Sequence, residues 1–266
     1  MFEVSIHDQE LARTAAVEAG HCLRAFSDQW QGVIGQATHD IKLEADQKAE
    51  SIILGLLKQN SKHAILSEEC GETGGAATED GLRWIVDPLD GTANYARGAP
   101  FASVSIALWQ GTQPLYGVVY DFWREELFYG GRQQGAFLND RPIHVSDVVK
   151  PSQATLSTGF PANRDFSEKA LLPFLGLVQR FKKIRLFGST ALALAYVACG
   201  RADAYLEDGI MLWDIAAGMA IVEGAGGETA MKPVPGQLHT CYAYAAACNS
   251  LQPDPERFGI NYAKSS

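Results

Sequence analysis

In residues 84–95 (WIVDPLDGTANY), an apolar run is followed by two carboxylates, Asp87 and Asp90. Such an apolar run is typical of a buried strand. Carboxylates are costly to bury unless a cation compensates their charge, so this stretch predicts a metal site at the open end of the strand. Pro88 bends the chain, which lets both acids and the Leu89 carbonyl converge on one ion. The alternative is a tight surface turn, because Asp, Pro and Gly are common turn residues.

Two junctions in the sequence offer groups that could hold a phosphate or another small anion. Gly91 and Thr92 follow the two acids, and their backbone N–H groups could bind phosphate oxygens. Gly188, Ser189 and Thr190 lie between a predicted strand and a predicted helix, where Ser189 or Thr190 is expected to cap the helix. A plain capped helix is the alternative at this second junction.

Further acids lie at the ends of other predicted elements. Glu68 and Glu69 follow a short strand, and neighbouring side chains on an extended chain face opposite sides, so at most one of them can face a metal. Asp46 and Asp214 each lie at a helix start, where the helix dipole or a capping role alone would explain a carboxylate. As a set, the acids offer only oxygen ligands, which suit Mg²⁺ or Mn²⁺. Two such ions beside a bound phosphate would favour hydrolysis of a phosphate ester. The set comprises Asp46, Glu68, Asp87, Asp90 and Asp214.

The bulk composition narrows the class of protein and its partners. A chain of 266 residues that is 47% hydrophobic can bury a sizeable core. Its net charge of −9 argues against a nucleic-acid backbone or an anionic membrane as the main partner. The five cysteines show no C-x-x-C spacing, which indicates a reducing compartment, and the six scattered histidines argue against zinc. The sequence has no secretory-type start and no long apolar run, so we expect a cytoplasmic protein.

Hydrophobic periodicity predicts the elements that must position these residues. Amphipathic helices are expected at 8–27 and 44–59, with an irregular polar segment at 31–43 between them. Short strands are expected at 64–66 and 82–86, separated by a Gly/Thr/Ala-rich loop. Four further segments joined by short turns predict an antiparallel sheet; they are 101–109, 114–121, 126–129 and 135–140.

The second half of the sequence alternates strands and helices, which predicts a mixed sheet with helices against it. Strands are expected at 154–159, 183–187 and 202–206, and helices at 166–181, 190–199 and 213–224. The pattern changes near 146–152 without any linker-like spacer. We therefore expect one compact unit with two halves, the metal-binding motifs in 1–148 and substrate-side residues in 149–266.

Three motifs in order carry a resemblance to a known family. They are SEE at 67–69, WIVDPLDGTANY at 84–95 and WDIAAGMAIVEGAGG at 213–227. Together they resemble the motifs of the inositol monophosphatase family, which belongs to the lithium-sensitive, Mg²⁺-dependent phosphatase superfamily. The resemblance covers nearly the whole chain. It implies an α/β (α+β) fold, a layered α/β/α/β/α sandwich of the type shared with fructose-1,6-bisphosphatase, and a homodimer. The implied activity is hydrolysis of a small phosphate monoester, with inositol 1-phosphate as the first expectation.

The resemblance also implies roles for individual residues. Glu68, Asp87 and the Leu89 carbonyl would hold a first Mg²⁺, and Asp90 and Asp214 a second, with Asp87 shared. Thr92, backed by Asp46, would orient and deprotonate the attacking water, and Glu68 belongs to the same catalytic group. The substrate-binding set is Asp90, Gly91, Thr92, Gly188, Ser189, Thr190, Glu207 and Asp214. Two or three ions are implied per site, Mn²⁺ could replace Mg²⁺, and Li⁺ would inhibit. The run 40–46 lacks the threonine usual in the family, which puts a third ion in doubt.

Other interpretations stay open at this point. Related phosphatases of the same superfamily act on histidinol phosphate, fructose 1,6-bisphosphate or 3′(2′),5′-bisphosphate nucleotides. The aspartate-nucleophile phosphatases also end a strand in two acids, but their acids are two residues apart, whereas Asp87 and Asp90 are three apart. A non-enzymatic alternative is a regulatory protein that uses the same fold to bind a partner.

Overall fold

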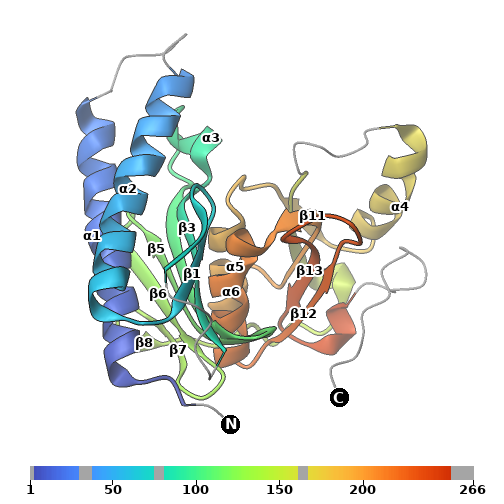
Figure 1. Cartoon of the computed structure of the whole chain (residues 1–266). Coiled ribbons are helices and arrows are strands. Elements are labelled where there is room, and N and C mark those ends of the chain that lie inside the picture. Colours follow the sequence, from blue (N-terminus) through green and yellow to red (C-terminus); the bar gives the residue numbers. More distant parts are fainter. Residues whose placement is uncertain (1–2, 30–37, 75–80, 161–166, 253–266) are drawn as a thin grey trace.

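Alternating layers of helices and sheets make up the part of the chain that this computed structural model describes, residues 3–29, 38–74, 81–160 and 167–252. Figure 1 shows the order of the layers from left to right: two long helices, a large sheet, two central helices, a smaller sheet and one outer helix. Apolar side chains fill each of the spaces between neighbouring layers. The predicted α/β/α/β/α sandwich is confirmed.

The outer layer consists of α1 (Ile6–Gln29) and α2 (Thr38–Asn60), which lie side by side on one face of the large sheet. Their sheet-facing residues are small or aliphatic at helical spacing, so both helices bury one stripe, which includes Ala15, Leu23 and Ile53. Helix α1 matches its predicted range closely. Helix α2 begins at Thr38, six residues before the predicted start, and the rest of the predicted irregular segment, 31–37, lies outside the described residues.

The large sheet has eight strands in the described residues, in the order β2-β1-β3-β4-β5-β6-β7-β8. Strands β1 and β3 are parallel and all other pairs are antiparallel. The predicted antiparallel run is confirmed as β4 to β7, whereas β2 and β8 were not predicted. The bounds are β1 Ala64–Ser67, β2 Gly71–Gly74, β3 Leu82–Asp90, β4 Ser103–Gln110, β5 Gln113–Asp121, β6 Glu126–Gly131, β7 Gly135–Leu138 and β8 Arg141–Pro142.

Strand β3 continues through both of its acids, which corrects the expectation that it ends at Val86. Asp87 pairs with Ser105 and Asp90 with Ser103, so two residues of β3 oppose one residue of β4 between these pairs. This is a β-bulge, and its extra residue puts two side chains three positions apart on the same face, which a regular strand cannot do. Pro88 lies within the bulge, where its missing N–H removes no ladder hydrogen bond.

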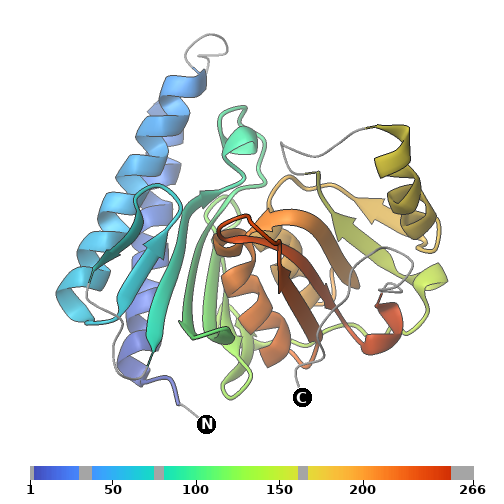
Figure 2. The same cartoon turned by 45° about the vertical axis from the view of Figure 1, so that its right-hand side comes forward.

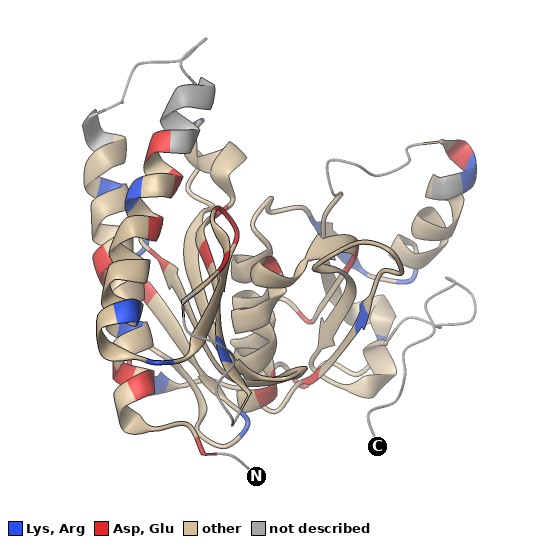
Figure 3. Ribbon diagram, viewed as in Figure 1, with Lys and Arg blue, Asp and Glu red and all other residues tan. Residues whose placement is uncertain are grey.

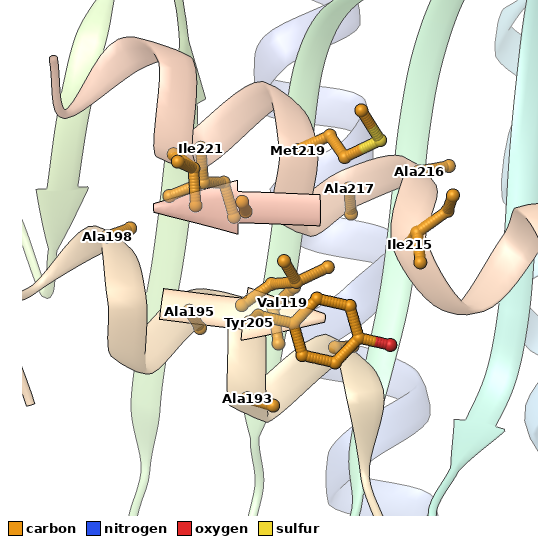
Figure 4. Close-up of a cluster of buried hydrophobic side chains, with 14 of the residues drawn as sticks. Val119, Ala193, Ala195, Ala198, Tyr205, Ile215, Ala216, Ala217, Met219 and Ile221 are labelled. Carbon is orange, nitrogen blue, oxygen red and sulfur yellow. The ribbon is translucent and has the colours of Figure 1, made fainter. Parts of the chain in front are cut away.

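The central layer consists of α5 (Thr190–Ala198) and α6 (Leu212–Gly224), which lie against the large sheet. Figure 4 labels small side chains on both helices, Ala193 and Ala195 on α5 and Ala216 and Ala217 on α6, and all four belong to one buried cluster. A side chain at Gly218 would come within 2.4 Å of Leu194, so the glycine allows the two helices to touch. This close packing fixes the two helix starts, where Thr190 and Asp214 lie.

The smaller sheet has five strands in the described part, in the order β10-β9-β11-β13-β12, and α4 (Glu168–Val178) covers its outer face (Figure 2). Its parallel and antiparallel pairs confirm the predicted mixed sheet. Strand β11 runs on to Met211, beyond its predicted end at 206, and β12 and β13 were not predicted. The bounds are β9 Thr155–Thr158, β10 Lys183–Arg185, β11 Ala204–Met211, β12 Glu228–Pro233 and β13 Thr240–Ala246. The remaining helical elements are short: α3 (Thr92–Tyr95) and the 3₁₀ turns 151–153 and 249–251.

The larger sheet lies within residues 64–142 and the smaller within 155–246, so the predicted boundary near 148 falls between them. The division into a metal-binding half and a substrate half stays a prediction. Among the described helices, none combines the length and the apolar character that crossing a membrane requires.

Candidate active site

A cavity of about 290 Å³ lies where the two sheets and the starts of the central helices meet. Its walls come from the end of β3, the turn after β1, strands β9 and β11, and the first residues of α5 and α6. All predicted site residues except Asp46 line it, together with residues that were not predicted. The full lining is Glu68, Asp87, Leu89, Asp90, Gly91, Thr92, Ala93, Thr158, Gly159, Phe160, Phe187, Gly188, Ser189, Thr190, Ala193, Tyr205, Glu207, Ile210 and Asp214.

Three acids converge at this cavity from distant parts of the sequence. Carboxylate oxygens of Glu68, Asp87 and Asp214 all lie within 4.8 Å of one another. Asp87 is 1% exposed, and its Oδ1 accepts a hydrogen bond from the Leu89 N–H at 3.0 Å. Asp214 is the third residue of α6, and its Oδ2 accepts from the Met211 N–H at 3.4 Å, so it also closes the start of that helix.

Of the two adjacent glutamates after β1, only Glu68 belongs to this three-acid cluster, whereas Glu69 is exposed to solvent. Only one of the two glutamates therefore belongs to the cluster, and its role as a metal ligand stays a prediction. The Glu68 N–H donates to the Val86 carbonyl at 3.1 Å, which ties the turn to β3 just before Asp87. Parallel pairing of β1 and β3 therefore brings Glu68 beside Asp87.

Burial and mutual repulsion act together on the cluster. Burial raises the pKa of Asp87 well above its usual value, and the charges of Glu68, Asp90 and Asp214 raise it further. Burial likewise raises the pKa of Asp214, with added contributions from Asp90, Glu68 and Glu207. Carboxylates held so close together without a positive charge favour protonation. A divalent cation at this point would remove the repulsion.

Asp90 lies beside the cluster but is held by the start of α5. Its Oδ2 accepts hydrogen bonds from the Ser189 hydroxyl and from the Ala191 N–H at 2.9 Å, and its Oδ1 accepts from the Thr190 N–H at 3.2 Å. Ser103 Oγ also donates to Oδ2 at 3.4 Å. Burial raises the pKa of Asp90 to about 6, although the hydrogen bonds from Ser189, Ala191 and Thr190 lower it. Its role as a ligand stays a prediction.

Of the two residues predicted as the cap of α5, Ser189 fills the role, and its Oγ accepts from the Leu192 N–H at 3.4 Å. Gly188 before it has a φ of +69°, a conformation that favours glycine. The Nδ2 of Asn94 donates to the carbonyls of Phe187 (2.8 Å), Gly188 (3.1 Å) and Phe101 (2.8 Å). This amide therefore ties the loop before α5 to the segment that carries Gly91 and Thr92.

Thr92 begins the short helix α3 directly after the metal-site acids. Its Oγ1 donates to the Leu89 carbonyl at 2.9 Å. Gly91 has a φ of +82°, and a side chain there would come within 2.5 Å of the Phe101 carbonyl. Asp46 is 1% exposed on α2, which packs against α3, and it is absent from the cavity lining given above. Its predicted action through Thr92 stays a prediction.

On the other side of the cavity, Glu207 is 7% exposed on β11. The Tyr205 hydroxyl donates to its Oε2 at 3.0 Å and lies 3.3 Å from Thr190 Oγ1. A side chain at Gly159 would come within 2.4 Å of the Glu207 carboxylate, so the glycine makes room for it. Burial raises the pKa of Tyr205 well above its usual value, and the Glu207 charge adds to this. The phenol therefore stays protonated and orients Glu207.

The charged residues among the described lining of the cavity are all acidic. Five of its described lining residues are Asp or Glu, and none is Lys, Arg or His. Figure 3 shows red acidic positions at the upper end of the large sheet and on the adjoining central layer. Oxygen donors this close together fit a hard divalent cation such as Mg²⁺ or Mn²⁺. Without cations, the described walls of the cavity would repel a phosphate.

Comparison with known proteins agrees with this geometry. The family model for the inositol monophosphatase family matches residues 3–246. The chain belongs to the inositol monophosphatase family. Members of this family are phosphoric monoester hydrolases, so the predicted enzyme class is confirmed.

Similar proteins within the family carry two kinds of name. A Nus factor SuhB from Xylella fastidiosa is 44% identical over 217 residues, which are 80% of this chain and 78% of that protein. An inositol monophosphatase from Mesembryanthemum crystallinum is 42% identical over 218 residues, 80% of this chain and 81% of that protein. The solved structure of an inositol monophosphatase from Anabaena superposes with a TM-score of 0.79 at 34% identity and covers 92% of each chain.

Sequence reasoning missed several residues of the cavity. Tyr205 could have been found, because it lies two positions before Glu207 on a strand and therefore on the same face. Phe160, Phe187 and Ile210 had no such signal, since single apolar residues at strand ends look the same whether they line a cavity or a core. Thr158 and Ala193 also line the cavity and were not predicted.

Proposed function

We propose that this member of the family is a Mg²⁺-dependent phosphatase that hydrolyses small phosphate monoesters, with inositol 1-phosphate as its preferred substrate. One observation supports the metal dependence above all others: Glu68, Asp87 and Asp214 place oxygens within 4.8 Å of one another beside a cavity without basic side chains among its described lining residues. The similarity to proteins named inositol monophosphatase supports the choice of substrate.

In this proposal the chain's own residues divide the work. Glu68, Asp87 and the Leu89 carbonyl would hold one ion, and Asp90 and Asp214 another. Divalent ions held there supply the positive charge that a phosphate needs and make water a usable nucleophile near neutral pH. Thr92 Oγ1, now bonded to the Leu89 carbonyl, would position the attacking water, and Asp46 would support it from α2.

The substrate would place its phosphate at the cluster and its alcohol portion across the cavity from it. The N–H groups of Gly91 and Thr92 would bind phosphate oxygens as charge develops on them. Glu207, oriented by Tyr205, would accept hydrogen bonds from hydroxyls of the alcohol, and the Gly188–Thr190 turn would border the same group. A polyol phosphate fits these acceptors better than a phosphate ester without hydroxyls.

The decisive experiment is a phosphate-release assay on a substrate panel. Inositol 1-phosphate, fructose 1,6-bisphosphate, histidinol phosphate, a 3′,5′-bisphosphate nucleotide and p-nitrophenyl phosphate would be tested with Mg²⁺, with Mn²⁺, with added Li⁺ and with EDTA. We expect release only with Mg²⁺ or Mn²⁺, fastest with inositol 1-phosphate and reduced by Li⁺. Undiminished release in EDTA would contradict the mechanism. A faster rate with another ester would make that ester, and not inositol 1-phosphate, the preferred substrate.

A matched pair of variants ties the assay to the cluster. Glu68→Gln should reduce phosphate release by about 100-fold or more, because it removes a proposed ligand. Glu69→Gln changes the neighbouring residue, which is exposed and lies outside the three-acid cluster, and should leave the rate unchanged. Equal losses in both variants would point to a general effect of charge in this turn.

The predicted homodimer is part of the proposal. Large apolar side chains are exposed on α4 and beside β10, an edge strand of the smaller sheet, and such surface supports self-association; they are Leu172, Leu175 and Leu186. Light scattering on the purified chain would give the mass. A monomer at micromolar concentration would remove this element of the proposal.

A second candidate function is regulatory binding of a partner. The naming of similar proteins as Nus factor SuhB supports it. The Glu68→Gln variant separates the two functions, because a role in partner binding would survive the loss of phosphate release, whereas a role that depends on catalysis would not.

A further inference from the structure

The sheet-facing stripe of α2 carries two carboxylates in an otherwise apolar surface. Asp46 and Glu50 are one helical turn apart, and Ala45, Ala49 and Ile53 around them are fully buried. A carboxylate that leaves water loses hydration unless hydrogen bonds replace it. Asp46 already has a proposed role beside Thr92. Glu50 has no role in that proposal, and its hydrogen bonds go to the turn that carries Glu68.

Glu50 holds the turn that presents Glu68. Its Oε1 accepts a hydrogen bond from the Ser67 hydroxyl at 2.5 Å and another from the Cys70 N–H at 3.1 Å. Ser67 is the last residue of β1 and is 0% exposed. The two donors lie on either side of Glu68 and Glu69, so one carboxylate oxygen of Glu50 clamps both ends of the turn.

We propose that Glu50 is a positioning residue that fixes Glu68 in the metal-binding cluster. The inference rests on the proposed function, because it gives Glu68 the role of a ligand. The turn is also held from outside, because Ser67 pairs with Gly71 of β2 and the Glu68 N–H is bonded to Val86. Glu50 adds the bond to the Cys70 N–H inside the turn. Without this clamp the turn would gain conformational freedom, and binding an ion would have to order it again. Partners that orient ligands in this way typically contribute about 10–100-fold to metal affinity.

Substitutions at Glu50 separate this role from a loss of charge. Glu50→Gln keeps an oxygen that can accept from Ser67 and Cys70, whereas Glu50→Ala removes the acceptor. The matched control is Glu44→Ala on the same helix, because Glu44 is about half exposed and pairs only with Lys48 across one turn among the ion pairs of the described residues. It removes the same charge from α2 without touching the turn.

The experiment is calorimetric titration of the metal-free full-length chain with Mn²⁺, and the folded state of each variant is checked by its unfolding curve. Glu50→Ala should bind Mn²⁺ about 10–100-fold more weakly than wild type, while Glu50→Gln should bind within about threefold and Glu44→Ala as wild type. A folded Glu50→Ala variant with wild-type affinity would overturn the proposal. An equal loss in Glu50→Gln would also overturn it, because charge would then be the cause.

If Glu50→Ala does not fold, Ser67→Ala decides, since it removes one of the two donors. A loss of about threefold or more in Mn²⁺ affinity supports the clamp, and no loss overturns it. Failure of the proposed function would look different: the wild-type chain itself would bind no Mn²⁺ or would release phosphate equally in EDTA.

Discussion

Replacing the most buried acid of the cluster should stabilise the metal-free protein. Asp87→Asn removes the charge of a residue that is 1% exposed and keeps an oxygen that can accept from the Leu89 N–H. Its side-chain shape is nearly unchanged, so the variant isolates the electrostatic effect. In EDTA at neutral pH, we expect it to be more stable than wild type, which is the opposite of most substitutions at buried sites.

The magnitude follows from the spacing of the cluster. Two unit charges 4.8 Å apart repel by about 3.5 kcal/mol at an effective dielectric constant of about 20, and Asp87 faces both Glu68 and Asp214. Partial exposure of Glu68 and Asp214 and uptake of protons reduce this value. We expect a gain of about 1–3 kcal/mol in the free energy of unfolding, or roughly 2–4 °C in Tm for each kcal/mol.

The gain should depend on pH with a defined sign. The pKa of Asp87 is raised in the folded chain, so the folded state holds a proton more tightly than the unfolded state. Wild-type stability in EDTA therefore falls as the pH rises from the unfolded Asp value of about 4 through the raised folded value. The advantage of Asp87→Asn is absent near pH 4 and complete above the folded pKa.

Urea unfolding at several pH values, with EDTA and with saturating Mg²⁺, measures both effects. Mg²⁺ should stabilise wild type and should stabilise Asp87→Asn much less, since a ligand of the native state adds stability only where it binds. Glu69→Gln serves as the control, with no change expected. An Asp87→Asn variant that is less stable than wild type in EDTA at neutral pH would refute the reasoning about repulsion.

Three further predictions concern neighbouring residues. Affinity for Mg²⁺, measured by calorimetry, should fall as the pH is lowered from 8 to 5, because the pKa values of Asp87, Asp90 and Asp214 are all raised and the ion must then displace protons; constant affinity over this range would exclude these acids as ligands. Tyr205→Phe should lower kcat/KM for inositol 1-phosphate by about 3–10-fold and leave p-nitrophenyl phosphate nearly unchanged, because it removes the hydrogen bond to Glu207; equal losses would reject this role. Asn94→Ala should lower the free energy of unfolding by about 1–3 kcal/mol in urea titrations, because three carbonyls lose their shared donor; a change below about 0.5 kcal/mol would show that the tie is unimportant.

The parts of the fold that sequence predicted are those with strong local patterns. Helix α1 carries apolar residues at helical spacing, and strands β4 to β7 are largely apolar segments joined by short turns. Strand β13 has the sequence TCYAYAA, in which alanine fills both faces and hides the alternation, and β12 is a polar edge strand. The extension of β3 depends on a bulge opposite Ser103 and Ser105, a pairing that only the folded sheet reveals.

The candidate site divides in the same way. The meeting of Glu68, Asp87 and Asp214 was predicted from the motifs, because each acid lies at the end of a predicted element. The hydrogen bonds of Asp90 to Ser189 and Thr190 join residues about 100 positions apart, and nothing local to either segment indicates them. Such contacts depend on how the two sheets are placed against the central helices.

The most direct test of the account is anomalous diffraction from crystals of the chain grown with Mn²⁺. The account predicts a peak bound by oxygens of Glu68, Asp87 and Asp214, and loss of that peak in Glu68→Gln crystals grown in the same way. A cluster without a peak at saturating Mn²⁺, in protein that still releases phosphate, would contradict it.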